Sequence, residues 1–171
     1  MSIKSIRVKN LLSFEDIYIS DFKDITCIVG QNNAGKSNLL NILNYFYSSL
    51  RGEKVVPPSL YSNYSAMGSI TIEYDTTKLK KVVTSRGAKN PYFRHIFKTL
   101  FSFRSNLTGL AAFGEFIEEQ SRNESKYSLT LAVKNDNSIR WSTKNKDVLE
   151  IINRVYPFFF IDTRHINLYG K

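Results

Sequence analysis

The sequence predicts an α/β fold built around a glycine-rich loop, and three observations support this prediction. A glycine-rich loop at residues 30–37 follows a short apolar run and directly precedes an amphipathic helix. Alternating apolar and polar residues before the loop predict two strands, and strand and helix patterns recur after it. With 171 residues, of which 42% are hydrophobic, the chain is large enough for one compact domain.

Three strands are expected before the loop. Apolar residues alternate with polar neighbours at Ile3, Ile6, Val8, Ile17 and Ile19. This alternation predicts two half-buried strands joined by a turn near residues 12–14. Residues 25–29 (Ile-Thr-Cys-Ile-Val) are almost wholly apolar, which predicts a central strand covered on both faces. Cys27 in this run and Trp141 are expected to fill core or hairpin positions.

A helix is expected from Gly35 onward. Helical spacing is followed by the apolar residues Leu39, Ile42, Leu43, Phe46 and Leu50. Gly52 is suited to end the helix in the left-handed conformation, and the prolines at positions 57–58 prevent its resumption.

The remaining chain alternates strand and helix patterns. Strands are predicted at 69–74, 80–85, 127–133, 138–141 and 158–161, and helices at 91–104, 107–121 and 146–155. The first two of these strands are expected to pair around a turn at 75–77. The third and fourth form a predicted hairpin, because the polar loop 134–137 is rich in residues that tolerate turn geometry.

The loop at residues 30–37 reads Gly-Gln-Asn-Asn-Ala-Gly-Lys-Ser and satisfies the pattern G-x-x-x-x-G-K-[ST] in a strand, loop and helix context. Its backbone N–H groups and the helix N-terminus are suited to bind phosphate. Lys36 then supplies positive charge to the outer phosphates, and Ser37 supplies a hydroxyl ligand for Mg²⁺. The predicted nucleotide-binding residues are Gly30, Gln31, Asn32, Asn33, Ala34, Gly35, Lys36, Ser37 and Asn38.

Positive charge is concentrated in one part of the chain. The formal net charge is +9, and the segment from Thr76 to Gly114 has several basic residues and no acidic one. Arg94, Lys98 and Arg104 are interleaved with aromatic residues there, so they are candidate nucleic-acid contacts. In the alternative interpretation, the aromatic residues pack inward on one helix face and the basic residues are merely solvated.

Composition also bears on the cellular compartment. The sequence has no apolar run near the roughly 20 residues that a bilayer span needs, and its first residues do not resemble a secretory signal. The single cysteine cannot form an intramolecular disulfide, which fits a reducing compartment. We therefore expect a cytoplasmic protein that does not insert into membranes.

The residues around the loop carry a family resemblance. The turn Asn10-Leu11-Leu12-Ser13-Phe14 matches N-x-x-S-F, and the loop with Asn38 matches G-x-N-x-x-G-K-S-N. Residues 3–43 thereby resemble the first lobe of the ABC-type ATPase heads of the RecF, SMC and OLD group. The loop together with residues 160–168 is most similar to the ATPase subunits of Septu and retron-associated anti-phage defence systems.

This resemblance implies a P-loop NTPase fold for residues 1–171, with a mixed or antiparallel sheet and inserted helices at roughly 86–125. It implies Mg·ATP as ligand, ATP-coupled dimers or higher oligomers of heads, and a nuclease or effector partner in phage defence or DNA metabolism. It further implies that Ser13 and Phe14 lie near the adenosine. Arginines at this place in similar heads can approach nucleotide or DNA, although a solvated strand face is favoured for Arg7 and Lys9 here.

One departure from the family pattern bears on catalysis. Hydrolysis in these heads needs a second lobe with an L-S-G-G-like signature, and the sequence shows none. We therefore expect either a piece of a longer ATPase or a chain whose partner supplies that lobe. Asp162 ends an apolar run as a Walker B aspartate does, but Thr163 stands where the catalytic Glu belongs. The favoured interpretation makes 158–164 the last strand of the first lobe, with Arg164 near the phosphates.

Two other functions are compatible with the sequence. A small P-loop kinase would place Asp162 on Mg²⁺ and Arg164 on the acceptor, but two strands before the loop are unusual for that class. A nucleic-acid-binding module without turnover is the other alternative. The intact Lys36 and Ser37 argue against it, because both residues serve phosphate and metal binding.

Overall fold

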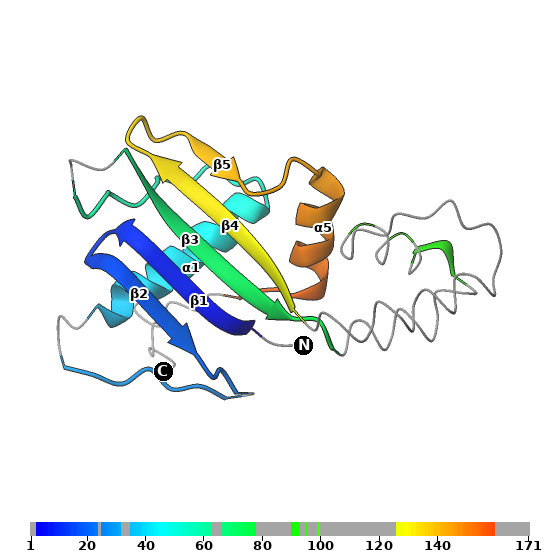
Figure 1. The fold of residues 1–171 in the computed structure, drawn as a ribbon, viewed down its shortest axis with the longest axis horizontal. Coiled ribbons are helices and arrows are strands. Elements are labelled where there is room, and N and C mark those ends of the chain that lie inside the picture. Colours follow the sequence, from blue (N-terminus) through cyan, green and yellow to red (C-terminus); the bar gives the residue numbers. More distant parts are fainter. Residues whose placement is uncertain are drawn as a thin grey trace, which may run out of the picture.

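The computed structural model describes residues 3–23, 25–31, 35–62, 66–77, 90–92, 95, 99 and 126–159. These residues form one antiparallel sheet and two longer helices (Figure 1). The strands are β1 (Ile3–Leu11), β2 (Phe14–Ser20), β3 (Met67–Asp75), β4 (Lys126–Lys134) and β5 (Ile139–Trp141). The helices are α1 (Lys36–Leu50) and α5 (Lys146–Val155).

The sheet has the strand order β2-β1-β3-β4-β5, and every pairing in it is antiparallel. Strand alternation divides its side chains between a core face and a polar face. One row of facing residues crosses all five strands on the core face: Ile17, Val8, Ile70, Leu131 and Trp141. The three central members of this row are fully buried, and burial of one such aliphatic side chain contributes about 1.5–3 kcal/mol.

Helices α1 and α5 cover the core face of the sheet, and Figure 1 shows α1 passing behind the central strands with α5 beside it. Aromatic rings fill the space between the layers. Phe46 meets Trp141 edge-on with ring centroids 5.1 Å apart, and Tyr47 stacks on Phe158 at 4.8 Å. Neither α1 nor α5 has the length and apolar character of a membrane-spanning helix, and no other helix in the described part of the chain does.

Several sequence predictions are confirmed. The alternating pattern at the start of the chain forms β1 and β2, and the predicted helix after the loop is α1, with all five of its periodic apolar residues buried. Gly52 follows α1 with φ of 77°, as its role in ending the helix requires. The predicted hairpin forms β4 and β5, Trp141 lies in it, and the predicted last helix has the bounds of α5.

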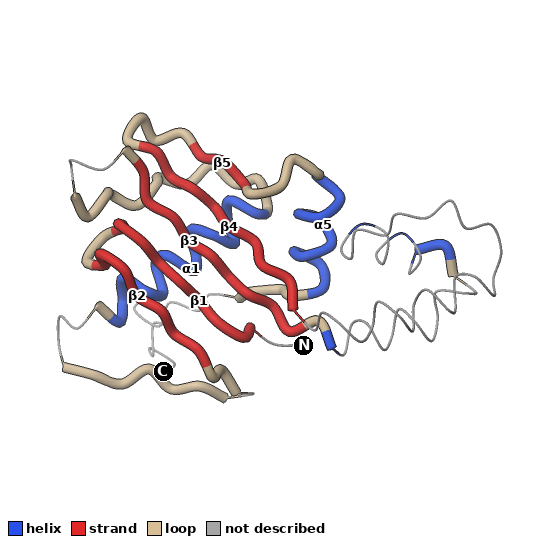
Figure 2. The backbone as a smooth tube through the Cα atoms, viewed as in Figure 1, coloured by secondary structure: helices blue, strands red, loops and turns tan. Residues whose placement is uncertain are grey.

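The prediction of a buried central strand at residues 25–29 is wrong for this structure. The segment is a loop beside the β2 edge of the sheet (Figure 2), with Ile25 85% and Val29 90% exposed. Cys27 is also exposed, so its predicted core or hairpin position is wrong. An apolar run becomes a strand only where a neighbouring strand pairs with its backbone groups, and no described strand pairs with this one.

Two further strand predictions need correction. The predicted pairing of 69–74 with 80–85 is wrong, because β1 and β4 occupy both edges of β3; residues 80–85 themselves lie outside the described residues. Phe158 and Phe159 are not in a strand, and Phe159 is 83% exposed. The rest of the predicted strand 158–161 and most of the expected helical insertion at 86–125 also lie outside the described residues.

Candidate nucleotide-binding site

Lys36 connects the two described ends of the phosphate-binding loop. Its ammonium group, Nζ, donates to the backbone oxygen of Gly30 at 2.6 Å and to that of Gln31 at 2.5 Å. Both acceptors lie at the start of the loop and Lys36 opens α1, so the lysine closes the loop onto itself. The ammonium group thus lies where it can exchange carbonyl partners for the more strongly attractive oxygens of a phosphate.

The start of α1 is a helix N-terminus without local negative charge. Gly35 caps the helix with φ of 83°, its backbone oxygen accepts from Leu39 N at 2.9 Å, and no side chain caps the N-terminus. The first turn also contains no acidic residue. A helix N-terminus carries partial positive charge on its free N–H groups. This end of α1 is therefore chemically suited to an anionic group.

The turn between β1 and β2 packs directly against this helix end. Asn38 Nδ2 donates to Ser13 Oγ at 2.8 Å. A Cβ atom added to Gly35 would lie 2.9 Å from Phe14 Cε1 and 3.3 Å from Ser13 Oγ, so only glycine fits there without movement. Sequence reasoning noted both the turn and the loop but missed this contact, since the two motifs are more than 20 residues apart in the chain.

One described side chain of the site could act as a ligand of a magnesium ion. Ser37 is exposed at the start of α1 and carries the hydroxyl group that the loop pattern assigns to the metal. The described residues contain no cluster of three or more histidine, cysteine or acidic side chains able to hold a metal. Oxygens of a phosphate and of water would therefore complete the coordination around this single hydroxyl.

A family model for an AAA ATPase domain matches residues 1–164. The chain belongs to this AAA ATPase domain family. Part of this ATPase domain is similar to curated proteins: it is 51% identical over 43 residues to an ATP/GTP phosphatase of Helicobacter pylori, covering 25% of the chain and 12% of that protein. It is 32% identical over 75 residues to a DNA double-strand break repair Rad50 ATPase of Methanococcus maripaludis, covering 44% and 8%.

Two solved structures share the fold of this ATPase domain. One comes from work on ATP-driven dimerization and DNA stimulated activation of SMC ATPases, with a TM-score of 0.53 and 13% identity over 93% of this chain and 86% of that chain. The other is an SmcHead bound to the C-winged helix domain of ScpA, with a TM-score of 0.53 and 14% identity over 88% and 39%. The predicted P-loop NTPase fold of an SMC-type first lobe is confirmed.

The chain spans only about a tenth of the length of the curated relatives that it matches. The RecF and SMC resemblance is supported at the level of the ATPase domain. The narrower similarity to Septu and retron-associated ATPases stays a prediction.

Several predicted site residues lie outside the described residues of the ATPase domain: Asn32, Asn33, Ala34, Arg94, Lys98, Arg104, Asp162 and Arg164. Their roles stay predictions. The structure does bring Gly30, Gln31 and Lys36 together and places Ser37 on the same helix turn. Asn38 adjoins this turn, but its amide is engaged with Ser13.

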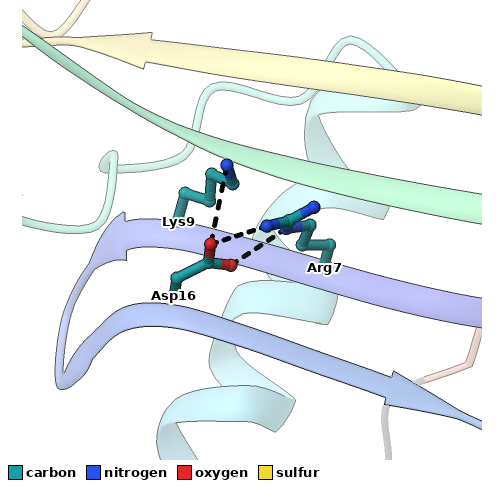
Figure 3. A network of polar contacts seen from close by, with 3 residues as sticks. All are labelled: Arg7, Lys9 and Asp16. Atoms are coloured by element: carbon teal, nitrogen blue, oxygen red, sulfur yellow. Dashed lines mark hydrogen bonds and ion pairs between the residues drawn. The ribbon is translucent and has the colours of Figure 1, made fainter.

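Arg7 and Lys9 lie on the polar face of the sheet, as the favoured interpretation predicted (Figure 3). Arg7 donates from Nε and Nη2 to the two carboxylate oxygens of Asp16 at 2.9 and 2.7 Å, and Lys9 lies 3.5 Å from the same carboxylate. The hydrogen bond from Arg7 lowers the pKa of Asp16 and raises that of Arg7 itself. Because all three side chains are solvated, this network contributes little to stability.

Proposed function

We propose that this ATPase domain binds Mg·ATP through residues 30–37 and serves as the nucleotide-binding lobe of an ATPase head. The observation that carries the proposal is the pairing of Lys36 with an open helix N-terminus. The loop and the first turn of α1 thereby offer an ammonium group and backbone donors to one phosphate group, and the Ser37 hydroxyl oxygen to the Mg²⁺ that accompanies it. Membership of the ATPase domain family supports the choice of ligand.

Each residue has a distinct role in the proposed binding step. Lys36 leaves the backbone oxygens of Gly30 and Gln31 and donates to the outer phosphates. The first N–H groups of α1 donate to the same oxygens, where the helix dipole favours negative charge. Ser37 directs its hydroxyl oxygen toward Mg²⁺, which neutralises phosphate charge when it is bound. A contact of Asp162 with the metal through a bound water belongs to the alternative interpretation, in which residues 158–162 are a Walker B strand.

ATP is the proposed nucleotide, and GTP is the natural competitor to test beside it. The H. pylori relative is named an ATP/GTP phosphatase, and it matches the chain over only 43 residues. Titration of both nucleotides with Mg²⁺ against the same protein separates the two. We expect tighter binding of ATP, and stronger binding of GTP would reverse the assignment of the base.

We further propose that residues 25–29 join the sheet of a second lobe, which a longer chain or a partner supplies. The motivation is the exposure of Ile25, Ile28 and Val29 immediately before the loop. A run of large exposed apolar side chains is normally covered in an assembled protein. Two heads would then enclose ATP between them, with a nuclease or effector partner and a role in anti-phage defence or DNA metabolism. A cytoplasmic location accompanies this proposal.

The decisive experiment for nucleotide binding compares Lys36→Ala with a matched lysine variant. Lys54→Ala is a suitable control, because Lys54 is exposed and lies beyond the end of α1. Loss of charged hydrogen bonds at Lys36 is expected to weaken Mg·ATP binding by about 10-fold to 100-fold, with no change for Lys54→Ala. Equal affinities for both variants and for the unmodified protein would remove the proposed function.

The assembly proposal has its own test. Ile25→Lys places a charge in the exposed run without touching the loop. In the protein with its second lobe present, we expect this variant to lose ATP turnover while keeping nucleotide affinity. Unchanged turnover would show that residues 25–29 are not an assembly surface. A separate measurement tests whether Lys98 and Arg104 contact nucleic acid. If they do, DNA should stimulate ATP turnover less in the Lys98→Glu and Arg104→Glu variants than in the unmodified protein.

A further inference from the structure

The turn between β1 and β2 is held rigidly by the rest of the fold. Asn10 and Leu12 both have positive φ, 49° and 52°, a conformation that costs non-glycine residues of order 1 kcal/mol and persists only where neighbours enforce it. Asn10 Nδ2 donates to the backbone oxygen of Met67 at 3.0 Å, and Leu12 N donates to the backbone oxygen of Ser59 at 2.9 Å. The turn is therefore anchored to the sheet and to the segment before β3.

The same turn also contacts the start of α1. Ser13 Oγ accepts from Asn38 Nδ2 at 2.8 Å, and the Phe14 ring lies so close to Gly35 that an added Cβ would meet it at 2.9 Å. Gly35 and Asn38 flank Lys36 and Ser37 in the chain. The two residues assigned to phosphate and metal thus lie between two fixed points.

We propose that Ser13, Phe14 and Asn38 are positioning residues that hold the first turn of α1 in the orientation needed to bind phosphate. This inference rests on the proposed nucleotide site. The Ser13–Asn38 hydrogen bond fixes the rotation of the turn about the helix axis, and the Phe14 ring fixes its distance from the sheet. Neither side chain has to touch the nucleotide for this effect, because the turn acts through the backbone of Gly35 and through Lys36.

The energetic reason lies in preorganisation. The open N-terminus of α1 has no side-chain cap, so its first turn lacks the local bonds that hold most helix ends. A helix end of this kind frays unless something outside the helix restrains it. A restraint from the anchored turn leaves the backbone donors free for a ligand, which a capping side chain within the helix would not do. The cost of ordering the turn is then met before the ligand arrives.

A double-mutant cycle tests the hydrogen bond. Ser13→Ala, Asn38→Ala and the double variant are titrated with a fluorescent ATP analogue and Mg²⁺, with Asn41→Ala as the control on the exposed side of the same helix. We expect each single variant to weaken binding about fivefold and the double variant to be no weaker than either single one. Ser13→Thr keeps a hydroxyl and is expected to retain the original affinity.

A second measurement reads the positioning without nucleotide. Hydrogen exchange of the Leu39 amide, which donates to Gly35, reports the opening of the first turn. We expect exchange about fivefold faster in Ser13→Ala and Asn38→Ala, and unchanged exchange in Asn41→Ala. Phe14→Leu, which keeps an apolar side chain in the partly buried position, is expected to accelerate exchange as well.

The outcomes separate this inference from the proposed function. If Lys36→Ala abolishes ATP binding while the cycle shows no coupling and Leu39 exchange is unchanged, the positioning role is wrong and the nucleotide site stands. If exchange accelerates but the protein binds no nucleotide, the restraint is real and both functional proposals fall. If only the melting temperature changes, the contact serves stability alone and the inference is overturned.

Discussion

Helices α1 and α5 pack on the same face of one sheet, yet their N-terminal ends differ in every respect that concerns charge. At α5, Asn145 precedes the helix and its side chain accepts from Asp147 N at 2.9 Å, and Asp147 adds a negative charge to the first turn. At α1, Gly35 precedes the helix without a side-chain cap, and the first turn holds no acidic residue.

This difference indicates which of the two helix ends is suited to bind an anion. The Asp147 N–H of α5 is satisfied by the adjacent Asn145 side chain, and the carboxylate of Asp147 complements the helix dipole. The start of α1 has no side-chain cap, and we propose that its donors serve an external anion while the Ser13 turn restrains it. The start of α5 is stabilised by its own residues, whereas the start of α1 is restrained by contacts with the turn between β1 and β2. A change of charge should therefore affect stability at α5 and nucleotide affinity at α1.

The largest expected effect comes from exchanging the residues at the second helical position, Ser37 and Asp147. Ser37→Asp gives α1 the negative charge that α5 has. It is expected to weaken Mg·ATP binding by about 100-fold through repulsion of the phosphates, while leaving the melting temperature equal or slightly higher because the charge complements the dipole. Asp147→Ser should do the reverse, with a small loss of stability and unchanged affinity. Calorimetry with and without nucleotide measures both quantities, and parallel effects at the two helices would break the comparison.

The next effect compares the two glycines at the ends of α1. Gly35 and Gly52 both have left-handed φ, 83° and 77°, but an added Cβ meets Phe14 only at Gly35 and has open space at Gly52. Gly35→Ala is expected to reduce nucleotide affinity about tenfold and to destabilise the fold by about 2 kcal/mol. Gly52→Ala should cost about 1 kcal/mol and leave affinity unchanged. Chemical denaturation and nucleotide titration of both variants distinguish backbone strain from loss of the loop geometry.

Away from their N-terminal ends the two helices contribute to one buried aromatic layer. Tyr47 lies in α1, and Tyr156 directly follows α5. Burial raises the pKa of Tyr47 to about 12, and it also raises the pKa of Tyr74 and Tyr156. An unfolded tyrosine ionises near its usual value of 10.0. The stability that these neutral buried tyrosines contribute is therefore fully present below that pH and is lost as pH rises through the folded pKa. Denaturation at increasing pH should show this decline.

The same decline should be smaller in Tyr47→Phe, because that variant has one buried hydroxyl fewer to ionise. Near-ultraviolet absorbance of tyrosinate gives an independent reading of the titration. If the buried rings titrated at the usual pKa in a fully folded protein, the aromatic layer would be more open to water than the structure describes.

The smallest effect concerns the cap of α5. Asn145→Ala removes the side chain that accepts from Asp147 N and should destabilise the fold by about 1 kcal/mol. Nucleotide affinity should not change, because α5 contributes no described residue to the loop. Asn145→Ser keeps a capping oxygen and should recover most of the loss. An affinity change in Asn145→Ala would mean that the two helix ends are energetically coupled.

The sequence alone determined the elements whose signals are local. The spacing of the apolar residues in α1 predicted its buried face, the bounds of α5 were predicted without error, and Gly52 predicted the end of α1. The loop pattern predicted which residues would adjoin the helix start, and the structure brings Gly30, Gln31 and Lys36 together there. Such signals are readable because each depends on neighbours within a few residues along the chain.

Only the tertiary structure decided what depends on partners far away in the chain. Residues 25–29 have the composition of a buried strand but are exposed, because strand formation needs a neighbouring strand that their composition cannot specify. Strand β3 likewise pairs with β1 and β4, which are distant in the chain, and not with the segment that follows it in the sequence. The contact of Ser13 with Asn38 arose in the same way, since packing of α1 on the sheet brings two distant motifs within hydrogen-bonding distance.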